Sequence, residues 1–122
     1  MNFENIAIGV DIEDIEQFEK MNLENDKLFL TSVFTPKELE YCFSDLKFAQ
    51  HLTVRYCAKE ATVKALSEFN IDGIKYNEIE ILNKANGQPK LVIKMFPNII
   101  AKVSLSHTKT QAIANVILLR NF

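Results

Sequence analysis

The segment from about Phe48 to Phe69 constrains the fold most, because its apolar residues recur at the spacing of one long helix. One stripe at 3.6-residue spacing, expected to face the core, consists of Val54, Cys57, Ala58, Ala61, Ala65 and Phe69. A second stripe on another side consists of Leu52, Tyr56, Val63 and Leu66. A helix packed on one surface leaves the second stripe in water, so we expect another subunit to cover it.

Shorter patterns before this segment predict three elements. The run "NIAIGVDIE" predicts a buried strand that ends near Asp11. The spacing of Ile15, Phe18 and Met21 then predicts a first short helix, with acidic residues in its first turn. In "FTPKELEYC", Thr35 as N-cap, Pro36 as first helical residue and Glu38 as partner in a capping box predict a second helix.

The region after Gly73 changes to the alternating pattern of strands. The runs "YNEIEIL" and "PKLVIKMF" flank "NKANGQ", whose Asn86-Gly87 pair predicts a hairpin turn. Two further strands are predicted by "AKVSLSH", which ends at His107, and by "QAIANVILLR", expected to be largely buried. With 122 residues and no repeat or linker, we expect a single domain over residues 1–122. The predicted class is α+β, with the long helix packed on a small, mainly antiparallel sheet.

Composition limits the partners and the compartment. Hydrophobic residues make up 48% and charged residues 25%, which is typical of a soluble globular protein. A net charge of -2 argues against nucleic acid or anionic membranes as partners. The apolar runs fall short of the roughly 20 residues that span a bilayer, and the chain start has no basic region, so we expect a cytoplasmic protein. Cys42 and Cys57 lack metal-type spacing and are expected to be reduced, with Cys57 as a small core residue.

Three features carry candidate chemistry, and each has a plain alternative. Asp11 at a strand end is also suited to capping the following helix. Glu60 and Lys64, at i and i+4, are suited to a helix-stabilising ion pair worth about 0.2–0.5 kcal/mol. His107 in "SLSHTK" is also consistent with a satisfied structural histidine.

The order of the motifs "IGVDIE", "RYCAKEATVKAL" and "VSLSHT" resembles that of the holo-acyl-carrier-protein synthases, the small bacterial type of 4'-phosphopantetheinyl transferase. The resemblance covers nearly the whole chain, including "FTPKELEYC" and "NGQP". It implies transfer of the phosphopantetheine arm of coenzyme A to a serine of an acyl carrier protein, with release of adenosine 3',5'-bisphosphate, in support of fatty acid or related biosynthesis. It also implies a homotrimer with active sites between subunits.

The resemblance further implies roles for the candidate residues. Asp11 and Glu60 match magnesium ligands, in keeping with the few carboxylates that Mg²⁺ takes beside water and phosphate oxygens. Glu60 is also implied as the base that accepts the proton of the attacking serine, directly or through a water. Lys64 would then place a cation against the phosphates or the leaving group. The implied catalytic set is Asp11, Glu60 and Lys64.

A coenzyme A site is implied at Arg55, Lys59, Lys64, Asn86, Gly87, Pro89, Ser106, His107 and Thr108. The basic residues of the long helix match positions near the nucleotide, with a solvated helix face as the alternative for Arg55 and Lys59. The turn at 86–89 matches a segment near the adenine, although Asn-Gly also suits a hairpin without ligand. Residues 106–108 match a segment near the phosphates and ribose.

Two positions depart from the pattern of the small bacterial type. Gln17 lies where that type usually carries an arginine that contacts the acidic carrier protein, so the choice of carrier stays open. Glu13 resembles the second acid of the Asp-x-Glu pair in larger transferases, and is either a third metal ligand or an acid in the first turn of a helix. The rival hypotheses are an inactive carrier-protein-binding module of the same fold and a structural oligomer with solvated charges.

Overall fold

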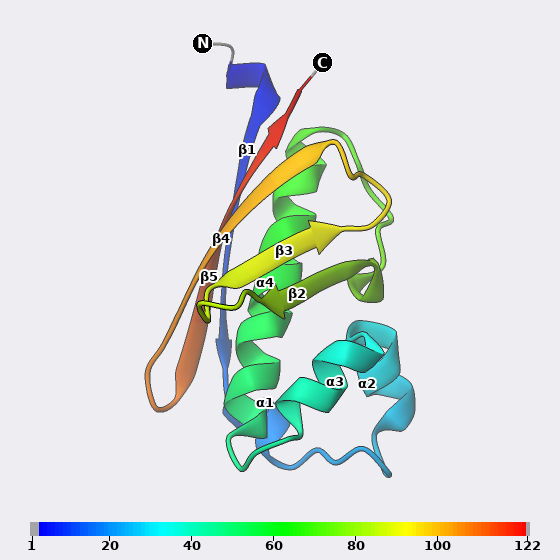
Figure 1. Ribbon diagram of the computed structural model, residues 1–122, viewed down its shortest axis with the longest axis vertical. Helices are drawn as coiled ribbons and strands as arrows, with labels where there is room; N and C mark the ends of the chain where they lie inside the picture. The colour runs from blue at the N-terminus through cyan, green and yellow to red at the C-terminus, as the bar shows by residue number, and fades with distance from the viewer. Residues whose placement is uncertain (1–2, 122) are drawn as a thin grey trace.

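One long helix lies against the inner face of an antiparallel sheet in the computed structural model, which describes residues 3–121 (Figure 1). The elements in chain order are η1 (Phe3–Asn5), β1 (Ile6–Asp14), α1 (Glu16–Glu19), α2 (Lys27–Val33), α3 (Pro36–Cys42), α4 (Phe48–Glu68), η2 (Tyr76–Glu78), β2 (Ile79–Asn83), β3 (Pro89–Ile93), β4 (Ile99–His107) and β5 (Gln111–Arg120). This arrangement confirms the predicted α+β class and the long helix.

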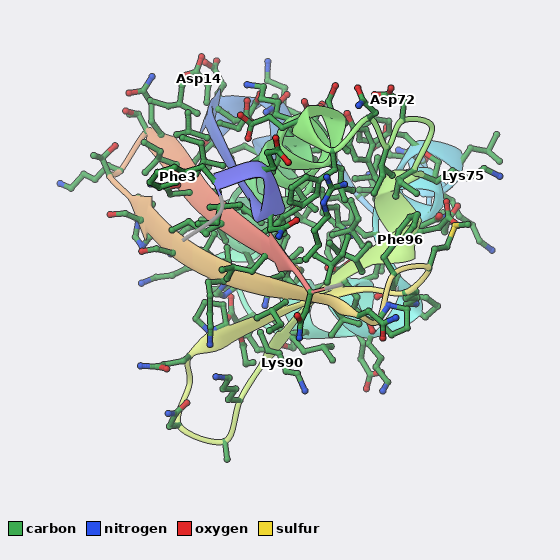
Figure 2. All side chains as sticks on the ribbon, turned by 90° about the horizontal axis from the view of Figure 1, so that it is seen from above. Phe3, Asp14, Asp72, Lys75, Lys90 and Phe96 are labelled. Carbon is green, nitrogen blue, oxygen red and sulfur yellow. The ribbon has the colours of Figure 1, made fainter. Side chains whose placement is uncertain are left out.

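Two antiparallel sheets form the β part of the molecule. The larger has the strand order β1-β5-β4, and β1 pairs with β5 along its whole length, from Ile6 opposite Leu119 to Asp14 opposite Gln111. The smaller is the β2–β3 hairpin, which lies beside β4 with β3 nearer to it (Figure 1). Seen from above, the hairpin turn projects away from the body of the molecule (Figure 2). Gly87 ends this turn at φ 86°, a conformation that suits glycine, so the hairpin prediction is confirmed.

The close approach of β1 to α4 depends on Gly9. A Cβ atom at this position would lie 1.9 Å from the carbonyl oxygen of Ala61, so only glycine fits where the strand meets the helix. The expected core stripe of α4 is confirmed, because all six of its members are buried. Cys57 is one of them, and both cysteines are buried and unpaired.

The expectation for the second stripe of α4 is wrong. Leu52 and Leu66 are fully buried within the chain itself, and Tyr56 and Val63 are half-buried. Leu52 packs in a cluster with residues of α1, α2 and α3, whereas Leu66 belongs to a second cluster that joins α4 to the large sheet and the β2–β3 hairpin. No second subunit is needed to cover this stripe, because segments distant in sequence fold back onto two sides of the helix.

The outer side of the large sheet carries a group of exposed apolar residues. The expectation that the first strand ends near Asp11 is wrong, because pairing with β5 continues β1 to Asp14. The first and last strands are also buried on one face only. Their outward-pointing residues form what we call the outer sheet face: Ile8, Val10, Ile12, Ile113 and Ile117, each at least 40% exposed.

The three helices before α4 follow the prediction in part. The capping box of α3 is confirmed, since the Thr35 hydroxyl accepts from the backbone N–H of Glu38 and the Glu38 carboxylate accepts from that of Thr35. The first helix is shorter than its pattern indicates and is a single turn, while α2 has no counterpart in the prediction. None of the helices between residues 3 and 121 combines the length and apolarity that crossing a bilayer requires.

Candidate functional site

Three carboxyl groups converge where β1 passes α4. Asp11 and Glu13 share the inward face of β1, and Asp11 is 9% exposed. Burial, together with the neighbouring charges of Asp11 and Glu60, raises the pKa of Glu13 from 4.5 to about 7. The Oδ2 atom of Asp11 is buried and has no hydrogen-bond partner among the described residues. Such an oxygen is costly unless something else binds it.

Lys64 joins this cluster from α4. Its Nζ atom lies 3.3 Å from Asp11 Oδ1 and donates to the carbonyl oxygen of Val10 at 3.0 Å. The ion pair with Glu60 that the i, i+4 spacing allowed is not formed in the described part of the chain. The side chain of Lys64 is 56% exposed, so its ammonium group remains accessible to a ligand at this site.

Glu60 is held by a hydrogen bond from a tyrosine. The Tyr76 hydroxyl donates to Glu60 Oε1 at 2.5 Å, and the Tyr76 ring lies 5.9 Å from the ring of Tyr56. Burial, together with the charge of Glu60 and a hydrogen bond to it, raises the pKa of Tyr56 to about 12. Burial and the same carboxylate raise the pKa of Tyr76 as well. Both phenols therefore stay protonated at neutral pH and remain donors.

The carboxylate cluster suits a metal site that is completed by water and phosphate oxygens, such as a magnesium site, rather than one formed by protein side chains alone. Within residues 3–121, no group of three or more His, Cys, Asp or Glu side chains is arranged to hold a metal ion. Mg²⁺ does not require such a cage, because one or two carboxylates with waters and substrate phosphates suffice. The unpartnered Oδ2 of Asp11, beside Glu13 and Glu60, suits that kind of site.

The structure excludes a helix-capping role for Asp11 and a first-turn position for Glu13. Asp11 does not cap the following helix, because α1 begins at Glu16 and its N-cap position, Ile15, makes no side-chain cap. Glu13 lies in β1 rather than in the first turn of α1. Its Oε1 atom accepts a hydrogen bond of 3.1 Å from Gln17, the residue that departs from the family pattern.

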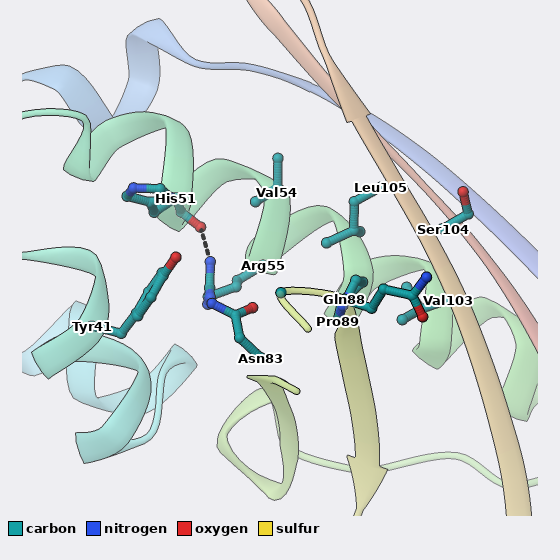
Figure 3. A pocket seen from close by; sticks show the side chains of 11 residues that line it. Tyr41, His51, Val54, Arg55, Asn83, Gln88, Pro89, Val103, Ser104 and Leu105 are labelled. Atoms are coloured by element: carbon teal, nitrogen blue, oxygen red, sulfur yellow. Dashed lines mark hydrogen bonds between the residues drawn. The ribbon is translucent and has the colours of Figure 1, made fainter. Parts of the chain in front are cut away.

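A cavity of about 420 Å³ opens between the first half of α4, the end of the β2–β3 hairpin and β4 (Figure 3). It is lined by Tyr41, His51, Val54, Arg55, Asn83, Gly87, Gln88, Pro89, Val103, Ser104 and Leu105. Three of the expected coenzyme A residues, Arg55, Gly87 and Pro89, thus meet at one cavity. Asn86 belongs to the same turn, where its Oδ1 atom accepts from the backbone N–H of Gln88.

Arg55 is buried rather than solvated, being 4% exposed. Its guanidinium group lies 4.5 Å from the centre of the Tyr41 ring and donates to the carbonyl oxygen of His51, the bond drawn in Figure 3. Its Nε atom has no hydrogen-bond partner among the described residues. A buried guanidinium with a spare donor on a cavity wall is suited to an anionic ligand.

Lys59 requires a correction. It is fully buried, and its ammonium group forms an ion pair of 2.8 Å with Glu38 and donates to the carbonyl oxygens of Tyr76 and Ile79. Burial lowers its pKa, an effect that Glu38 opposes. These three contacts use all three N–H donors of the lysine. Lys59 is therefore neither a solvated helix residue nor available to a phosphate, and we leave it out of the coenzyme A site.

The segment 106–108 lies where β4 ends. His107 Nε2 accepts a hydrogen bond of 2.9 Å from the Gln50 amide, and its Nδ1 donates to the carbonyl oxygen of Thr108 at 3.1 Å. In this pattern the Nδ1 atom carries a hydrogen. Thr108 accepts backbone N–H groups within the turn to β5, and Ser106 is exposed. His107 follows Ser104 and Leu105 of the cavity wall along β4.

Several residues of this region were not predicted from the sequence. Tyr56 precedes Glu60 by four residues, a spacing that places the two side chains on one side of the helix, but its apolar ring suggested packing alone. Tyr76 had no local sign of its role, because η2 returns to α4 only in the folded chain. Tyr41 and His51, which line the cavity, had none either.

Comparison with known proteins gives one consistent family. The model of the 4'-phosphopantetheinyl transferase superfamily matches residues 7–116. The holo-[acyl-carrier-protein] synthase of Geotalea daltonii is 38% identical over 118 residues, which cover 90% of this chain and 94% of that protein. The protein of the same name from Geobacter sp. strain M21 is 36% identical over 120 residues, with coverage of 92% and 96%.

Solved structures agree with these relatives. A holo-(acyl-carrier-protein) synthase from Bacillus anthracis in complex with CoA (3',5'-ADP) matches with a TM-score of 0.77 and 28% identity, covering 94% of this chain and 96% of that chain. The Helicobacter pylori holo-[acyl-carrier-protein] synthase in complex with coenzyme A matches with a TM-score of 0.74 and 28% identity, covering 91% and 98%.

Proposed function

The chain belongs to the 4'-phosphopantetheinyl transferase superfamily and, within it, to the holo-acyl-carrier-protein synthases, and from this premise we propose that it transfers 4'-phosphopantetheine from coenzyme A to a serine of an apo acyl carrier protein. The names of the curated relatives and the coenzyme A complexes of two structural neighbours support this reaction. In it, the serine oxygen forms a bond to the phosphorus that bears the pantetheine, and the bond from that phosphorus to the bridging oxygen breaks. Adenosine 3',5'-bisphosphate leaves.

We assign Asp11 and Glu60 as the residues that hold magnesium, with Glu13 as a candidate third ligand. When bound, the ion supplies positive charge that neutralises the pyrophosphate as negative charge spreads during transfer. Glu60 is placed to accept the serine proton, because its half-buried carboxylate lies near the acids of β1 and is held by neighbouring phenol hydroxyls. Lys64 offers an exposed ammonium group beside Asp11 for a phosphate oxygen.

The 420 Å³ cavity is our proposed place for the nucleotide end of coenzyme A. Arg55 offers its spare guanidinium donor to a phosphate there, and the turn at 86–89 closes one side. Residues 106–108 continue from the β4 wall of the cavity toward the phosphates and ribose. Because both ring nitrogens of His107 make hydrogen bonds, we assign it a hydrogen-bonding role at this position.

A homotrimer accounts for the outer sheet face. Isolated apolar residues on a surface are ordinary, but this face is a contiguous patch on two paired strands, with Ile8 directly opposite Ile117 and Ile12 opposite Ile113. β1 carries this face on one side and Asp11 on the other, so an interface here would lie on the opposite side of the strand that holds part of the carboxylate cluster.

We also propose that the protein works as a single domain in the cytoplasm, in fatty acid or related biosynthesis.

The observation that carries the proposed activity is the buried, unpartnered oxygen of Asp11 beside Glu60 and Lys64. Mass spectrometry of apo-carrier proteins incubated with the protein, coenzyme A and Mg²⁺ tests it, and the expected result is a gain of one phosphopantetheine by at least one carrier. A reaction without coenzyme A is the control. If coenzyme A binds but no carrier gains mass, the inactive carrier-binding module replaces the enzyme as the best hypothesis.

A further inference from the structure

Glu60 receives a hydrogen bond from a residue that no motif identifies. The Tyr76 hydroxyl lies 2.5 Å from Glu60 Oε1, and both side chains are half-buried, so water competes weakly for this contact. Tyr76 comes from η2, sixteen residues further along the chain, and not from the helix that carries Glu60. The bond therefore ties the carboxylate to a second, independent element.

The backbone of Tyr76 is fixed in turn by the buried lysine of α4. Lys59 Nζ donates to the Tyr76 carbonyl oxygen at 2.9 Å and pairs with Glu38 at 2.8 Å. Glu38 also accepts from the backbone N–H of Ile81 at 2.8 Å, just after η2. Because these groups are fully or almost fully buried and mutually satisfied, they hold η2 rigidly against α4.

Aromatic packing holds the ring itself. The Tyr76 ring lies 5.9 Å from the Tyr56 ring, which in turn lies 5.6 Å from the Phe18 ring. The ring is thus fixed on one side by other aromatic rings and at its hydroxyl by Glu60. Glu60 itself can rotate about three side-chain bonds, so without such a partner its carboxylate would sample several positions.

We propose that Tyr76 is a positioning residue for Glu60: its hydroxyl binds Oε1 and so holds the carboxylate in one orientation for the metal ion and the serine proton. This inference rests on the proposed function of the site. It also gives Lys59 a role through Tyr76, since the lysine places η2 without contacting a ligand. Residues that orient a metal ligand in this way typically matter 10–100-fold for metal affinity or activity.

The test is Tyr76→Phe, which removes the hydroxyl but keeps the ring and the backbone carbonyl bound to Lys59. We expect kcat to fall about 10–100-fold while KM for coenzyme A stays within about twofold, because the nucleotide cavity does not include Tyr76. Calorimetric titration with MgCl₂ alone should show a weaker Kd for the ion. A change in packing alone would lower the melting temperature and leave the Mg²⁺ affinity and the ratio of kcat to KM unaltered.

Thr62→Val is the matched control. Like Tyr76→Phe, it deletes one hydroxyl hydrogen bond, here the bond from Thr62 to the carbonyl oxygen of Ala58. Thr62 lies in the same helix as Glu60, but at a buried site away from it. We expect its kcat and Mg²⁺ affinity to match those of the wild type. Wild-type kcat and Mg²⁺ affinity in Tyr76→Phe would overturn the proposal. If the wild-type protein modifies no carrier, the proposed function fails, and the Mg²⁺ affinities of the two variants still decide the role of Tyr76.

Discussion

Lys59 and Lys64 lie on the same helix, yet their surroundings allow them different chemistry. Lys59 is fully buried and each of its donors is taken, so it can stabilise the fold but cannot bind a ligand. Lys64 is more than half exposed and pairs with Asp11 at 3.3 Å, a contact that a phosphate can share or replace. Both residues are lysines of α4, and only the burial of their side chains separates their roles.

At the residue scale, Asp11→Asn and Glu60→Gln should each lower the rate of carrier modification by about 100-fold or more, because each removes negative charge from the proposed magnesium site at nearly constant volume. The measurement is the initial rate of holo-carrier formation, with thermal unfolding to confirm that each variant is folded. Wild-type rates in either variant would refute the assignment. A loss of the same size in Glu13→Gln would make Glu13 a ligand, whereas a clearly smaller loss would not.

Glu13 should also make stability depend on pH. Its pKa is raised from 4.5 to about 7 in the fold, so the native state favours the protonated carboxyl. Its stabilising contribution is complete below pH 4.5 and is lost as the pH rises through about 7. Glu13→Gln, which stays neutral, should therefore melt higher than the wild type at pH 8 without metal, and the difference should shrink toward pH 4. A pH-independent difference between the two melting curves contradicts this reasoning.

At the scale of elements, the contact between β1 and α4 sets the geometry of the site. Gly9 allows the strand to approach the helix, and this approach brings Asp11 near Glu60 and Lys64. The capping box of α3 contributes in another way, because Glu38 both caps that helix and neutralises Lys59. Site and scaffold thus share residues at the places where elements touch.

Gly9→Ala should damage both stability and activity. The new Cβ atom would lie 1.9 Å from a backbone oxygen that cannot rotate away, so the helix and the strand must separate. Overpacking of this kind costs about 1–3 kcal/mol of unfolding free energy, measurable as a lower urea midpoint. We expect the rate of carrier modification to fall as well, since the carboxylates move apart.

Gly73→Ala is the control for this variant. Gly73 has φ 81° and open space around it, so alanine there adds backbone strain of about 1–2 kcal/mol without displacing a neighbour. Its activity should stay close to that of the wild type. Equal activity losses in the two variants would show that general destabilisation, and not the spacing of β1 and α4, accounts for the effect of Gly9→Ala.

At the scale of the whole molecule, the corrected packing changes which residues are expected to mediate assembly. Leu66 is fully buried within the subunit, so a charge there would disrupt folding rather than association. In the proposed trimer the outer sheet face meets other copies of the chain, and burying a side chain such as Ile8 contributes roughly 1.5–3 kcal/mol. An interface on this face also lies close to Asp11, which would couple assembly to activity.

We predict that light scattering at micromolar concentration gives the mass of a trimer for the wild type. Ile8→Lys combined with Ile117→Lys, two residues directly opposite each other on the outer sheet face, should shift the protein to monomers and lower the rate of carrier modification. Leu28→Lys, on α2 and 90% exposed, is a control that should leave the mass unchanged. A wild-type monomer with full activity would refute the trimer and the interface site together.

The sequence by itself determined the features that rest on near neighbours in the chain. The capping box of Thr35 and Glu38, the Asn86-Gly87 turn and the core stripe of α4 follow from local hydrogen bonds, backbone preference and helical period. The order of motifs also identified the family before any contact was known.

Only the tertiary structure decided the rest, because those features join residues far apart in the chain. The contact of Tyr76 with Glu60, the burial of Lys59 against Glu38 and the pairing that extends β1 to Asp14 each require a second element to arrive. Which stripe of α4 is covered is a question of the same kind. Regular apolar spacing indicates that a helix surface is apolar. The path of the whole chain determines whether that surface is buried within the subunit or left for a partner.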